Sequence, residues 1–505
     1  MTLGMDLHIA LSGSRSLTWE LYEQLRNAIL EGRLRPGEGL PPTRELATRL
    51  EVSRNTVLRA YERLTTEGFT SGRVGAGTFV REDAQVPKPR RRAPTTIELR
   101  PRPIWESILL PPERTPHTPI YDFRVGTPDV QSFPYDEWRR LLARPMRRGG
   151  ADAYGEPAGH PRLREAIARH IRISRSIQVD AEDILVTGGT QQALDLIGRV
   201  LIEPGMCVAM EDPGYPLARM SFHANGAQVA HVPVDEQGVQ VDAIPDSARM
   251  VYVTPSHQFP LGMAMTLARR MALLRWAERR RTAVIEDDYD GEFRFGGRPV
   301  DPLHRLDRTG CVLYVGSFSK VLLPSLRLGY VVAPPSLRAA LRTAKLVSDW
   351  HTPSVLQLAL AQFMEEGLLA RHVRKARREY ETRRERLHDA LHRHLRPWLE
   401  PMAPSVGLQM TASFCDEDID ARGVVRAARR SGIALHALSH FAVHPTSHQA
   451  LVLGYGAIAS GAIDQGIEAL ATVIRSLRPH AAARARARST QVTEIVRSRS
   501  PQRRR

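Results

Sequence analysis

The chain has 505 residues, and its 71 Lys and Arg outnumber its 55 Asp and Glu, for a formal net charge of +16. This excess of positive charge favours a polyanionic partner such as nucleic acid. The three cysteines lie too far apart for a disulfide framework or a metal site, no apolar run is long enough to cross a membrane, and the N-terminus has no signal-peptide pattern. We therefore expect a cytoplasmic protein with no metal ion.

The first 80 residues predict a helix-turn-helix unit. Apolar residues recur at helical spacing in LTWELYEQLRNAIL, and Gly and Pro-Gly follow that helix. The stretch TRELATRLEVSRNTVLRAYERL predicts two further helices joined by a tight turn, the second capped by Ser53. The segment FTSGRVGAGTFV alternates glycine with β-forming residues, as a two-stranded wing would. We expect the inner face of the capped helix to consist of Val57, Leu58, Tyr61 and Leu64.

The start of the capped helix carries side chains that suit the major groove of DNA. A recognition helix places its N-terminal residues there, where Arg reaches guanine edges and small polar groups reach phosphates. We expect this surface, with flanking arginines and the two glycines of the wing, to bind double-stranded operator DNA. For any single arginine, a solvated surface position is as good an interpretation as a contact. The expected residues are Arg44, Ser53, Arg54, Asn55, Thr56, Arg59, Arg73, Gly75 and Gly77.

Two segments differ in composition from the rest of the chain. Residues 81–119 are rich in Pro and Arg, which predicts an extended linker between an N-terminal unit and a larger one at 120–480. Residues 481–505 carry eight Arg against one Glu, which predicts a disordered tail. This tail would add affinity for DNA without sequence specificity. The alternative is a solvated tail with no role in binding.

From residue 120 onward, short apolar runs alternate with amphipathic helices. This alternation predicts an α/β fold with a mixed or mostly parallel sheet covered by helices. Ligands of such sheets bind beyond the carboxyl ends of the strands, and each run ends there in polar residues. The runs are DILVTGG, CVAMED, MVYVTPS, TAVIEDD and CVLYVGS.

Three of these strand ends carry candidate binding groups. Gly189 and Thr190 directly precede a helix, where free backbone amides and the helix dipole favour phosphate. The stretch IEDDYDGEF places acids and Tyr289 after a buried strand, where a carboxylate can keep a ring nitrogen protonated. Lys320 follows VLYVGS, where burial lowers its pKa and frees the amine for Schiff-base chemistry. Taken singly, the glycines are weak evidence, the acidic cluster is equally explained as strand-end solvation, and an isolated lysine is more often a surface charge.

Together these motifs resemble two known families. Residues 17–80, with LPPTRELA and VSRNTV, resemble the winged helix-turn-helix of the GntR family. Residues 120–480 resemble the fold-type I aminotransferases, which bind pyridoxal 5'-phosphate. The whole chain is similar to the MocR subfamily of GntR-type transcriptional regulators. The resemblance implies a homodimer that binds operator DNA and whose aminotransferase-like domain senses pyridoxal phosphate or an adduct of it with an amine or amino-acid effector.

The resemblance also implies a role for each candidate residue. Lys320 would form a Schiff base with the cofactor, Asp287 would pair with the pyridinium nitrogen, and Tyr289 would contact the phenolic oxygen. Tyr215 would stack on the ring, and Tyr154 would reach the phosphate from a partner subunit. The phosphate would be held by Gly189, Thr190, Ser317 and Arg327.

Two positions depart from the pattern of the catalytic relatives. Val452 stands where those enzymes carry an Arg that grips the substrate carboxylate. Phe259 stands where they carry an Asn that contacts the phenolic oxygen, so His257 or Gln258 would have to compensate. These losses favour sensing over turnover and disfavour an ordinary α-amino acid as the ligand. A competent aminotransferase that also binds DNA, and a DNA-binding protein whose large domain is empty, are the alternatives.

Overall fold

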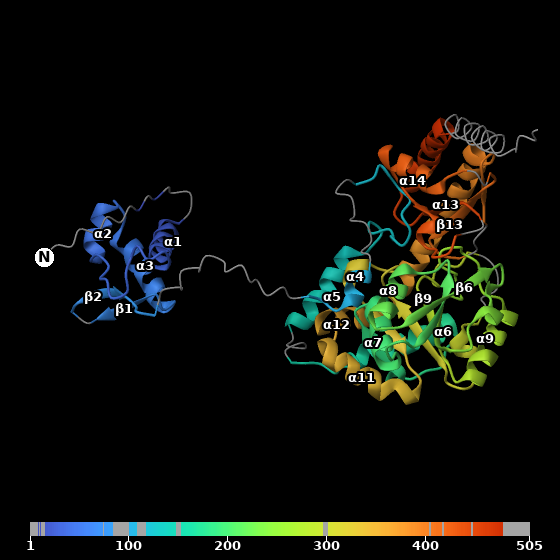
Figure 1. Cartoon of the computed structure of the whole chain (residues 1–505), viewed down its shortest axis with the longest axis horizontal. Coiled ribbons are helices and arrows are strands. Elements are labelled where there is room, and N and C mark those ends of the chain that lie inside the picture. Colours follow the sequence, from blue (N-terminus) through green and yellow to red (C-terminus); the bar gives the residue numbers. More distant parts are fainter. Residues whose placement is uncertain are drawn as a thin grey trace, which may run out of the picture. The chain divides into compact units, whose positions relative to one another are not determined.

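The computed structural model of the chain describes residues 9, 11, 16–73, 75–83, 100–108, 118–147, 153–295, 301–402, 406–416, 419–445 and 448–477 (Figure 1). The chain divides into two compact units, Met1–Pro101 and Arg102–Arg505. The boundary falls within the predicted linker, most of which, like the predicted tail at 481–505, lies outside the described residues. None of the described helices is long and apolar enough to cross a membrane.

The N-terminal unit contains three helices and a two-stranded wing, as predicted. The Ser53 hydroxyl accepts a hydrogen bond of 3.1 Å from the Thr56 amide and so caps the third helix. The two strands pair in antiparallel orientation, and Gly75 and Gly77 have positive φ at their turn. The elements are α1 (Leu17–Leu30), α2 (Thr43–Arg49), α3 (Arg54–Thr66), β1 (Thr70–Arg73) and β2 (Gly77–Val80).

One of the predicted inward positions in α3 is wrong. Leu58 is 39 % exposed, whereas Val57 and Tyr61 are buried. The buried face of a helix recurs every three or four residues, so the face that begins at Val57 continues at Ala60 and Leu64. Leu58 lies about 100° around the helix from Val57, and Ala60 takes the inward place that the prediction gave to Leu58.

The C-terminal unit is built on a mixed eight-stranded sheet. Its strand order is β4-β11-β10-β9-β8-β5-β6-β7. Strands β10, β9, β8, β5 and β6 are parallel, whereas β11 is antiparallel to both of its neighbours and β7 is antiparallel to β6. All five apolar runs that predicted strands lie in this sheet. The bounds are β4 (Ile184–Thr187), β5 (Cys207–Asp212), β6 (Gln228–Asp235), β7 (Gly238–Val239), β8 (Ala248–Val253), β9 (Ala283–Asp288), β10 (Val312–Ser317) and β11 (Gly329–Val332).

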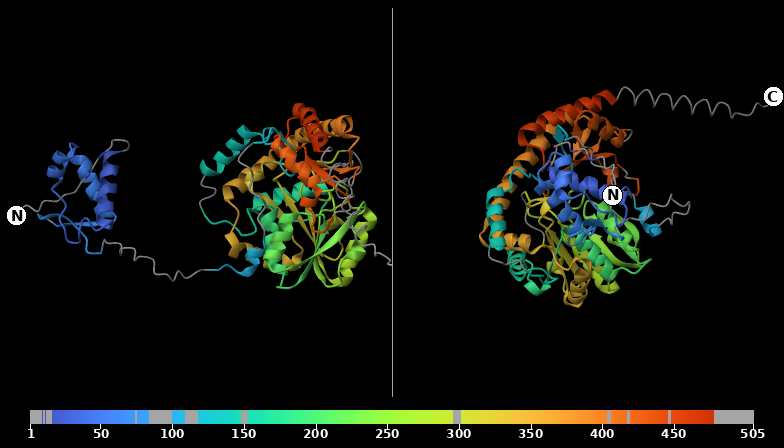
Figure 2. Two further views of the ribbon diagram at one scale, coloured as in Figure 1. Left: turned by 45° about the horizontal axis from the view of Figure 1, so that its top comes forward. Right: turned by 90° about the vertical axis from the view of Figure 1, so that its left-hand side faces the viewer.

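Helices cover both faces of this sheet (Figure 2). Successive residues of a strand point to opposite faces, and in β9 Ile285 packs in one hydrophobic cluster while Val284 packs in another. The cluster around Ile285 includes residues of α7, α8 and α11, and the cluster around Val284 includes α9. A third cluster joins α6 and α12 to β4, β10 and β11. The bounds are α6 (Pro161–Arg175), α7 (Thr190–Leu201), α8 (Pro216–Ala224), α9 (Leu267–Arg280), α11 (Pro335–Asp349) and α12 (Ser354–Glu365).

A smaller antiparallel sheet of order β12-β13-β16-β15 completes the unit. The long helix α13 (Leu368–Leu395) leads into it, and a helix at 463–477 follows it. Strands β3 and β14 form a separate parallel pair. The bounds are β3 (Tyr121–Asp122), β12 (Leu399–Pro401), β13 (Gln409–Phe414), β14 (Ile433–Ala434), β15 (His436–Ala437) and β16 (Ala450–Gly454), with α4 (Pro103–Ser107), α5 (Tyr135–Arg147), α10 (Leu303–Leu306) and α14 (Ala421–Arg430). Short 3-10 helices lie at Ala181–Asp183, Val241–Ala243, Pro324–Leu326, Leu438–His440 and Ser460–Ala462.

Candidate functional site

Lys320 lies three residues beyond the end of β10 and is half-buried. Its amine donates a hydrogen bond to the carbonyl oxygen of Gly126, a residue with φ of 81°. A Cβ atom at Gly126 would lie only 3.0 Å from the lysine nitrogen, so the approach depends on glycine there. Burial lowers the pKa of Lys320 and the charge of Arg327 lowers it further, while Asp290 and Asp287 act in the opposite direction.

Asp287 is buried near the carboxyl end of β9. Its Oδ2 accepts a hydrogen bond of 2.7 Å from the Tyr252 hydroxyl, and its Oδ1 is buried with no hydrogen-bond partner among the described residues. Burial raises the pKa of this carboxyl to about 7, with the hydrogen bond from Tyr252 and the charge of Lys320 opposing the rise. A buried acceptor of this kind is costly unless a ligand supplies a donor.

Tyr289, Phe259 and Tyr215 form an aromatic group beside these residues. The Phe259 ring lies 5.6 Å from that of Tyr215 and 5.8 Å from that of Tyr289, in edge-on contacts. The Tyr289 hydroxyl is 2.8 Å from His257 Nδ1, which is itself 2.9 Å from an oxygen of Asp290. Of the two residues considered as substitutes for the missing Asn, His257 is therefore the one that contacts Tyr289.

The other of these two residues, Gln258, is hydrogen-bonded to backbone groups of its own loop and of the segment after β5. Its amide nitrogen donates to the carbonyl oxygens of Pro213 and Phe259 at 2.9 Å, and its amide oxygen accepts from the Leu261 amide at 3.1 Å. Because these bonds use both ends of the side-chain amide, Gln258 fixes the loop that carries Phe259.

The start of α7 lies against Arg327. Gly189 is the N-terminal cap of this helix, and a Cβ atom there would lie 2.9 Å from an Arg327 guanidinium nitrogen. Arg327 is exposed and has no ion pair within the described parts of the chain. Ser317 pairs with Gly329 across β10 and β11, and a Cβ atom at Gly329 would lie 2.9 Å from the Cα of Gly189. The structure thus brings Ser317, Arg327 and the free amides of α7 into one area, which suits a phosphate.

Tyr154 lies apart from this group in the single chain. Its side chain is 79 % exposed, and its ring stacks on that of Trp350 with 4.6 Å between centroids. We find no contact between Tyr154 and the other predicted cofactor residues within the described ranges.

The predicted DNA-binding residues lie at the start of α3 and on the segments around it. Ser53 and Thr56 hydroxyls are 2.8 Å apart, and the Arg54 Nε donates a long hydrogen bond of 3.4 Å to Thr43. The Arg73 guanidinium lies over the Phe79 ring at 5.0 Å. The predicted side chains that are exposed are Arg44, Ser53, Arg54, Asn55, Arg59 and Arg73.

Comparison with known proteins accounts for both units. Residues 17–80 match the bacterial regulatory proteins of the gntR family, and residues 118–448 match the class I and II aminotransferases. The probable rhizopine catabolism regulatory protein MocR of Rhizobium meliloti is 38 % identical over 468 residues, which cover 91 % of this chain and 94 % of that protein. The chain belongs to the MocR group of GntR-family transcriptional regulators.

Further relatives agree with this assignment. The pyridoxine biosynthesis transcriptional regulator PdxR of Corynebacterium glutamicum is 33 % identical over 89 % of this chain and 95 % of its own length. Among solved structures, the kynurenine aminotransferase of Pyrococcus horikoshii is 29 % identical and has a TM-score of 0.66, covering 72 % of this chain and 92 % of that chain. As a MocR-type regulator, the chain combines a DNA-binding helix-turn-helix with an aminotransferase fold, and that fold implies binding of pyridoxal 5'-phosphate.

The residues present fit this cofactor. Asp287 offers a buried oxygen without a partner, as a protonated ring nitrogen requires, and Lys320 offers a half-buried amine of lowered pKa. Arg327 and the capping Gly189 offer a cation and a helix N-terminus, as a phosphate requires.

Sequence reasoning missed the partners of these groups. Nothing in the pattern marks Gly126 as the hydrogen-bond acceptor of Lys320, because the two lie 194 residues apart. Only the position of Tyr252 within the apolar run MVYV gave a weak indication of its role. A buried tyrosine hydroxyl usually has a hydrogen-bond partner, and here that partner is Asp287.

Proposed function

We propose that this MocR-type regulator binds pyridoxal phosphate between Asp287, Lys320 and Arg327, and that it senses the cofactor or an amine adduct of it. One observation carries this proposal. The Asp287 oxygen without a partner, the lysine amine of lowered pKa and the arginine beside the α7 N-terminus lie around one edge of one sheet. These are three different chemistries, and pyridoxal phosphate needs all three.

Each residue has a physical task in this proposal. Asp287 would accept a hydrogen bond from the protonated ring nitrogen, while Tyr252 donates a hydrogen bond to the second carboxyl oxygen. Burial lowers the pKa of Lys320, which favours the neutral amine that would condense with the carbonyl of the cofactor. When bound, the cofactor supplies a carbonyl that condenses with amines and a ring that withdraws electrons. Tyr289 and Tyr215 flank the ring, and Gly189, Thr190, Ser317 and Arg327 hold the phosphate.

The environment of Val452 supports sensing of an amine that has no α-carboxylate. Val452 is fully buried on β16 in a cluster with Leu438, Phe441 and Ala450, against which Phe259 packs. An apolar cluster offers a carboxylate neither a charge nor a donor, and burial of an unpaired carboxylate is costly. Retention of Lys320 and Asp287 would also suit transamination, so a competent aminotransferase that binds DNA is the second candidate.

We assign a separate role to each segment of the chain. Residues 1–80 bind operator DNA, residues 81–119 link the units, residues 120–480 bind the cofactor and residues 481–505 add non-specific affinity for DNA. The exposure of Tyr154 supports a homodimer in which this tyrosine reaches the phosphate of the partner subunit. The relative named for pyridoxine biosynthesis supports a link to the cofactor.

The absorption spectrum of the purified protein tests this function. We expect a visible band from cofactor bound to Lys320, and we expect the Lys320→Ala variant to lack it. A chain without any such band after incubation with pyridoxal phosphate would have an empty domain. Production of an amino acid from a keto acid and an amino donor by the wild type, and not by Lys320→Ala, would instead favour the aminotransferase.

A further inference from the structure

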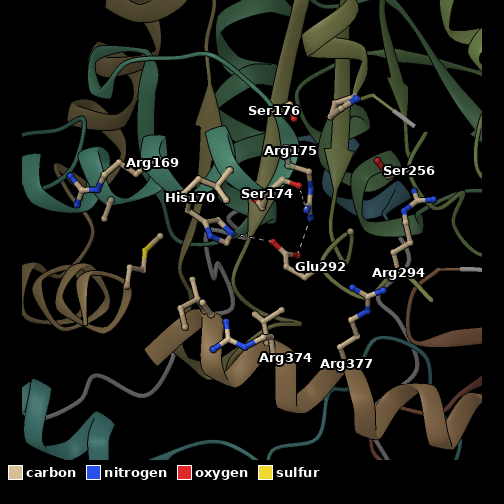
Figure 3. Close-up of a pocket in the computed structure, with 18 of the residues that line it drawn as sticks. Arg169, His170, Ser174, Arg175, Ser176, Ser256, Glu292, Arg294, Arg374 and Arg377 are labelled. Carbon is tan, nitrogen blue, oxygen red and sulfur yellow. Dashed lines mark hydrogen bonds and ion pairs between the residues drawn. The ribbon is translucent and has the colours of Figure 1, made fainter. Parts of the chain in front are cut away.

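A second cavity, of about 1060 Å³, lies in the C-terminal unit away from the residues proposed to hold the cofactor. Its walls are α6, the end of α12 with the first turns of α13, and the segment that follows β9 (Figure 3). None of the residues proposed to bind the cofactor lines it. The MocR-type function described above therefore leaves this cavity without a role.

The acids of this cavity already have cationic partners. Glu292 is 3.2 Å from Arg175 and 3.5 Å from His170, as the dashed lines in Figure 3 show. Glu365 pairs at 2.6 Å with Arg162, and the remaining acid, Asp301, pairs with an arginine one turn further along the chain. No acid of the lining is thus left to neutralise further positive charge.

Three arginines of the cavity have no such partner. Within the described parts of the chain, the side chains of Arg294, Arg374 and Arg377 form no ion pair and no hydrogen bond. Arg374 and Arg377 are three residues apart on α13 and so share one face of the helix. Figure 3 shows Arg294 beside Arg377. Burial lowers the pKa of Arg294, and the charges of Asp288 and Asp290 oppose this change. The charges of Arg175 and Arg377 lower the pKa of Arg294 further, so these three cations repel one another.

We propose that this cavity binds a small organic anion that carries phosphate groups, with Arg294, Arg374 and Arg377 as its cationic contacts. Three unpaired guanidinium groups match the charge of one or two phosphates, and the planar guanidinium suits their oxygens. Ile173, Met364 and Val373, also in the wall, offer apolar surface to the organic part.

The shape of the site favours a small ligand over nucleic acid. Small-molecule sites have volumes of roughly 300–1000 Å³, close to the volume of this cavity. Arg294 is half-buried in the concave wall, and Arg374 and Arg377 are exposed residues of the same wall. Such a wall encloses a small molecule better than it follows a DNA backbone.

The position of the cavity would couple it to the cofactor. Ser256 and Gly291 line the cavity, and their chain neighbours His257 and Asp290 form the hydrogen-bonded pair beside Tyr289. Arg175, also in the lining, is bound at 2.6 Å to Asp288, the neighbour of Asp287. An anion in the cavity therefore contacts segments that also shape the cofactor site, and the two ligands would alter each other's affinity.

Calorimetric titration with inorganic pyrophosphate tests the site in the full-length protein loaded with pyridoxal phosphate. We expect saturable binding of one pyrophosphate per chain. The variants Arg294→Gln and Arg377→Gln should each weaken it by at least about tenfold, since a charge-assisted hydrogen bond is worth that much or more. Arg378→Gln is the matched control, because Arg378 lies on the same helix outside the cavity and its Nε bonds only to a backbone carbonyl. Each variant should keep the visible band of the cofactor.

Three results would overturn the proposal. Absence of saturable binding, or equal affinities in all variants, would show that the cavity holds no phosphate. Binding only to cofactor-free protein, or loss of binding in Arg54→Ala, would place pyrophosphate at the cofactor site or on the N-terminal unit. Unchanged pyrophosphate affinity together with weaker, less salt-dependent operator binding by Arg294→Gln and Arg377→Gln would assign this surface to DNA phosphates instead.

Discussion

The Tyr252 hydroxyl donates a hydrogen bond of 2.7 Å to Asp287 Oδ2 at the buried edge of the main sheet. Asp287 Oδ1 has no partner among the described residues. Because Tyr252 occupies one oxygen, the other is the one that a ring nitrogen can approach. The hydrogen bond therefore fixes the position of the carboxyl that we expect to bind the cofactor ring, and it opposes the rise in pKa that burial causes.

Replacement of Asp287 by Ala should weaken the binding of pyridoxal phosphate by at least about tenfold, because a hydrogen bond to a charged group is worth about 1.5–3 kcal/mol. Titration of cofactor-free protein with pyridoxal phosphate measures this. Glu286→Gln is the control: Glu286 is also buried on β9 with a pKa raised to about 7, but it accepts from the Leu303 and His304 amides on the other face of the sheet. If the two variants bind pyridoxal phosphate with equal affinity, Asp287 does not contact the cofactor.

The pKa of Asp287 predicts a pH dependence of stability in the cofactor-free protein. Burial raises this pKa to about 7, above the value of about 3.9 in an unfolded chain. The folded state therefore holds a proton that the unfolded state has lost, and the stabilisation is complete below about pH 4 and declines as the pH rises towards about 7. Relative to Asp287→Asn, the wild type should lose up to about 1.4 kcal/mol of unfolding free energy per pH unit in this window.

Chemical denaturation of the wild type and Asp287→Asn at several pH values between about 4 and 7 measures this difference. The comparison cancels the contribution of Glu286, which is also buried with a pKa raised to about 7. The contribution of Glu211 changes in the variant, because the charge of Asp287 helps to raise the pKa of Glu211. A difference that does not change with pH would show that Asp287 ionises normally in the folded protein.

Sequence reasoning succeeded where the signal was local. Alternation of apolar runs with amphipathic helices predicted five of the strands in the main sheet, and Ser53 was identified as a helix cap from its neighbours alone. The error at Leu58 was also local, since two adjacent apolar residues cannot both lie at the centre of one helical face.

Contacts between distant segments were beyond such reasoning. The carbonyl of Gly126 reaches Lys320, and Arg175 reaches Asp288, only because the strand order brings together residues far apart in the chain. The arginines of the cavity, which have no ion pair within the described ranges, could not be identified either. A charged residue predicts a solvated surface until its neighbours in space are known.

Arg54→Ala should weaken specific operator binding by about 1–3 kcal/mol, because one good contact between Arg and a base edge is worth that much. Fluorescence anisotropy with operator DNA at fixed salt measures the change, and the cofactor band should be unaffected. Arg33→Ala is the control, since Arg33 is an exposed arginine of the same unit that pairs with Glu31. If both variants lose affinity equally, Arg54 contributes charge alone and does not read the operator.

The apolar cluster around Val452 predicts a preference among effector amines. Isobutylamine and valine differ by one carboxylate, and the apolar side chains of this cluster would offer that carboxylate no hydrogen-bond donor. Isobutylamine should therefore perturb the cofactor band at a concentration at least about tenfold lower than valine does. Titration of the loaded protein with both compounds measures the ratio, and an equal or better response to valine would show that a cation elsewhere accepts the carboxylate.

The central claim is that the cofactor site of this MocR-type regulator controls its DNA-binding unit. Operator titrations of cofactor-free protein, loaded protein and loaded protein with isobutylamine test it most directly, with Lys320→Ala in parallel. Couplings between sites typically amount to about 1–3 kcal/mol, so operator affinity should shift by about fivefold or more between these states, and Lys320→Ala should respond less. Superimposable curves under every condition would contradict the claim and leave a DNA-binding protein whose cofactor is silent.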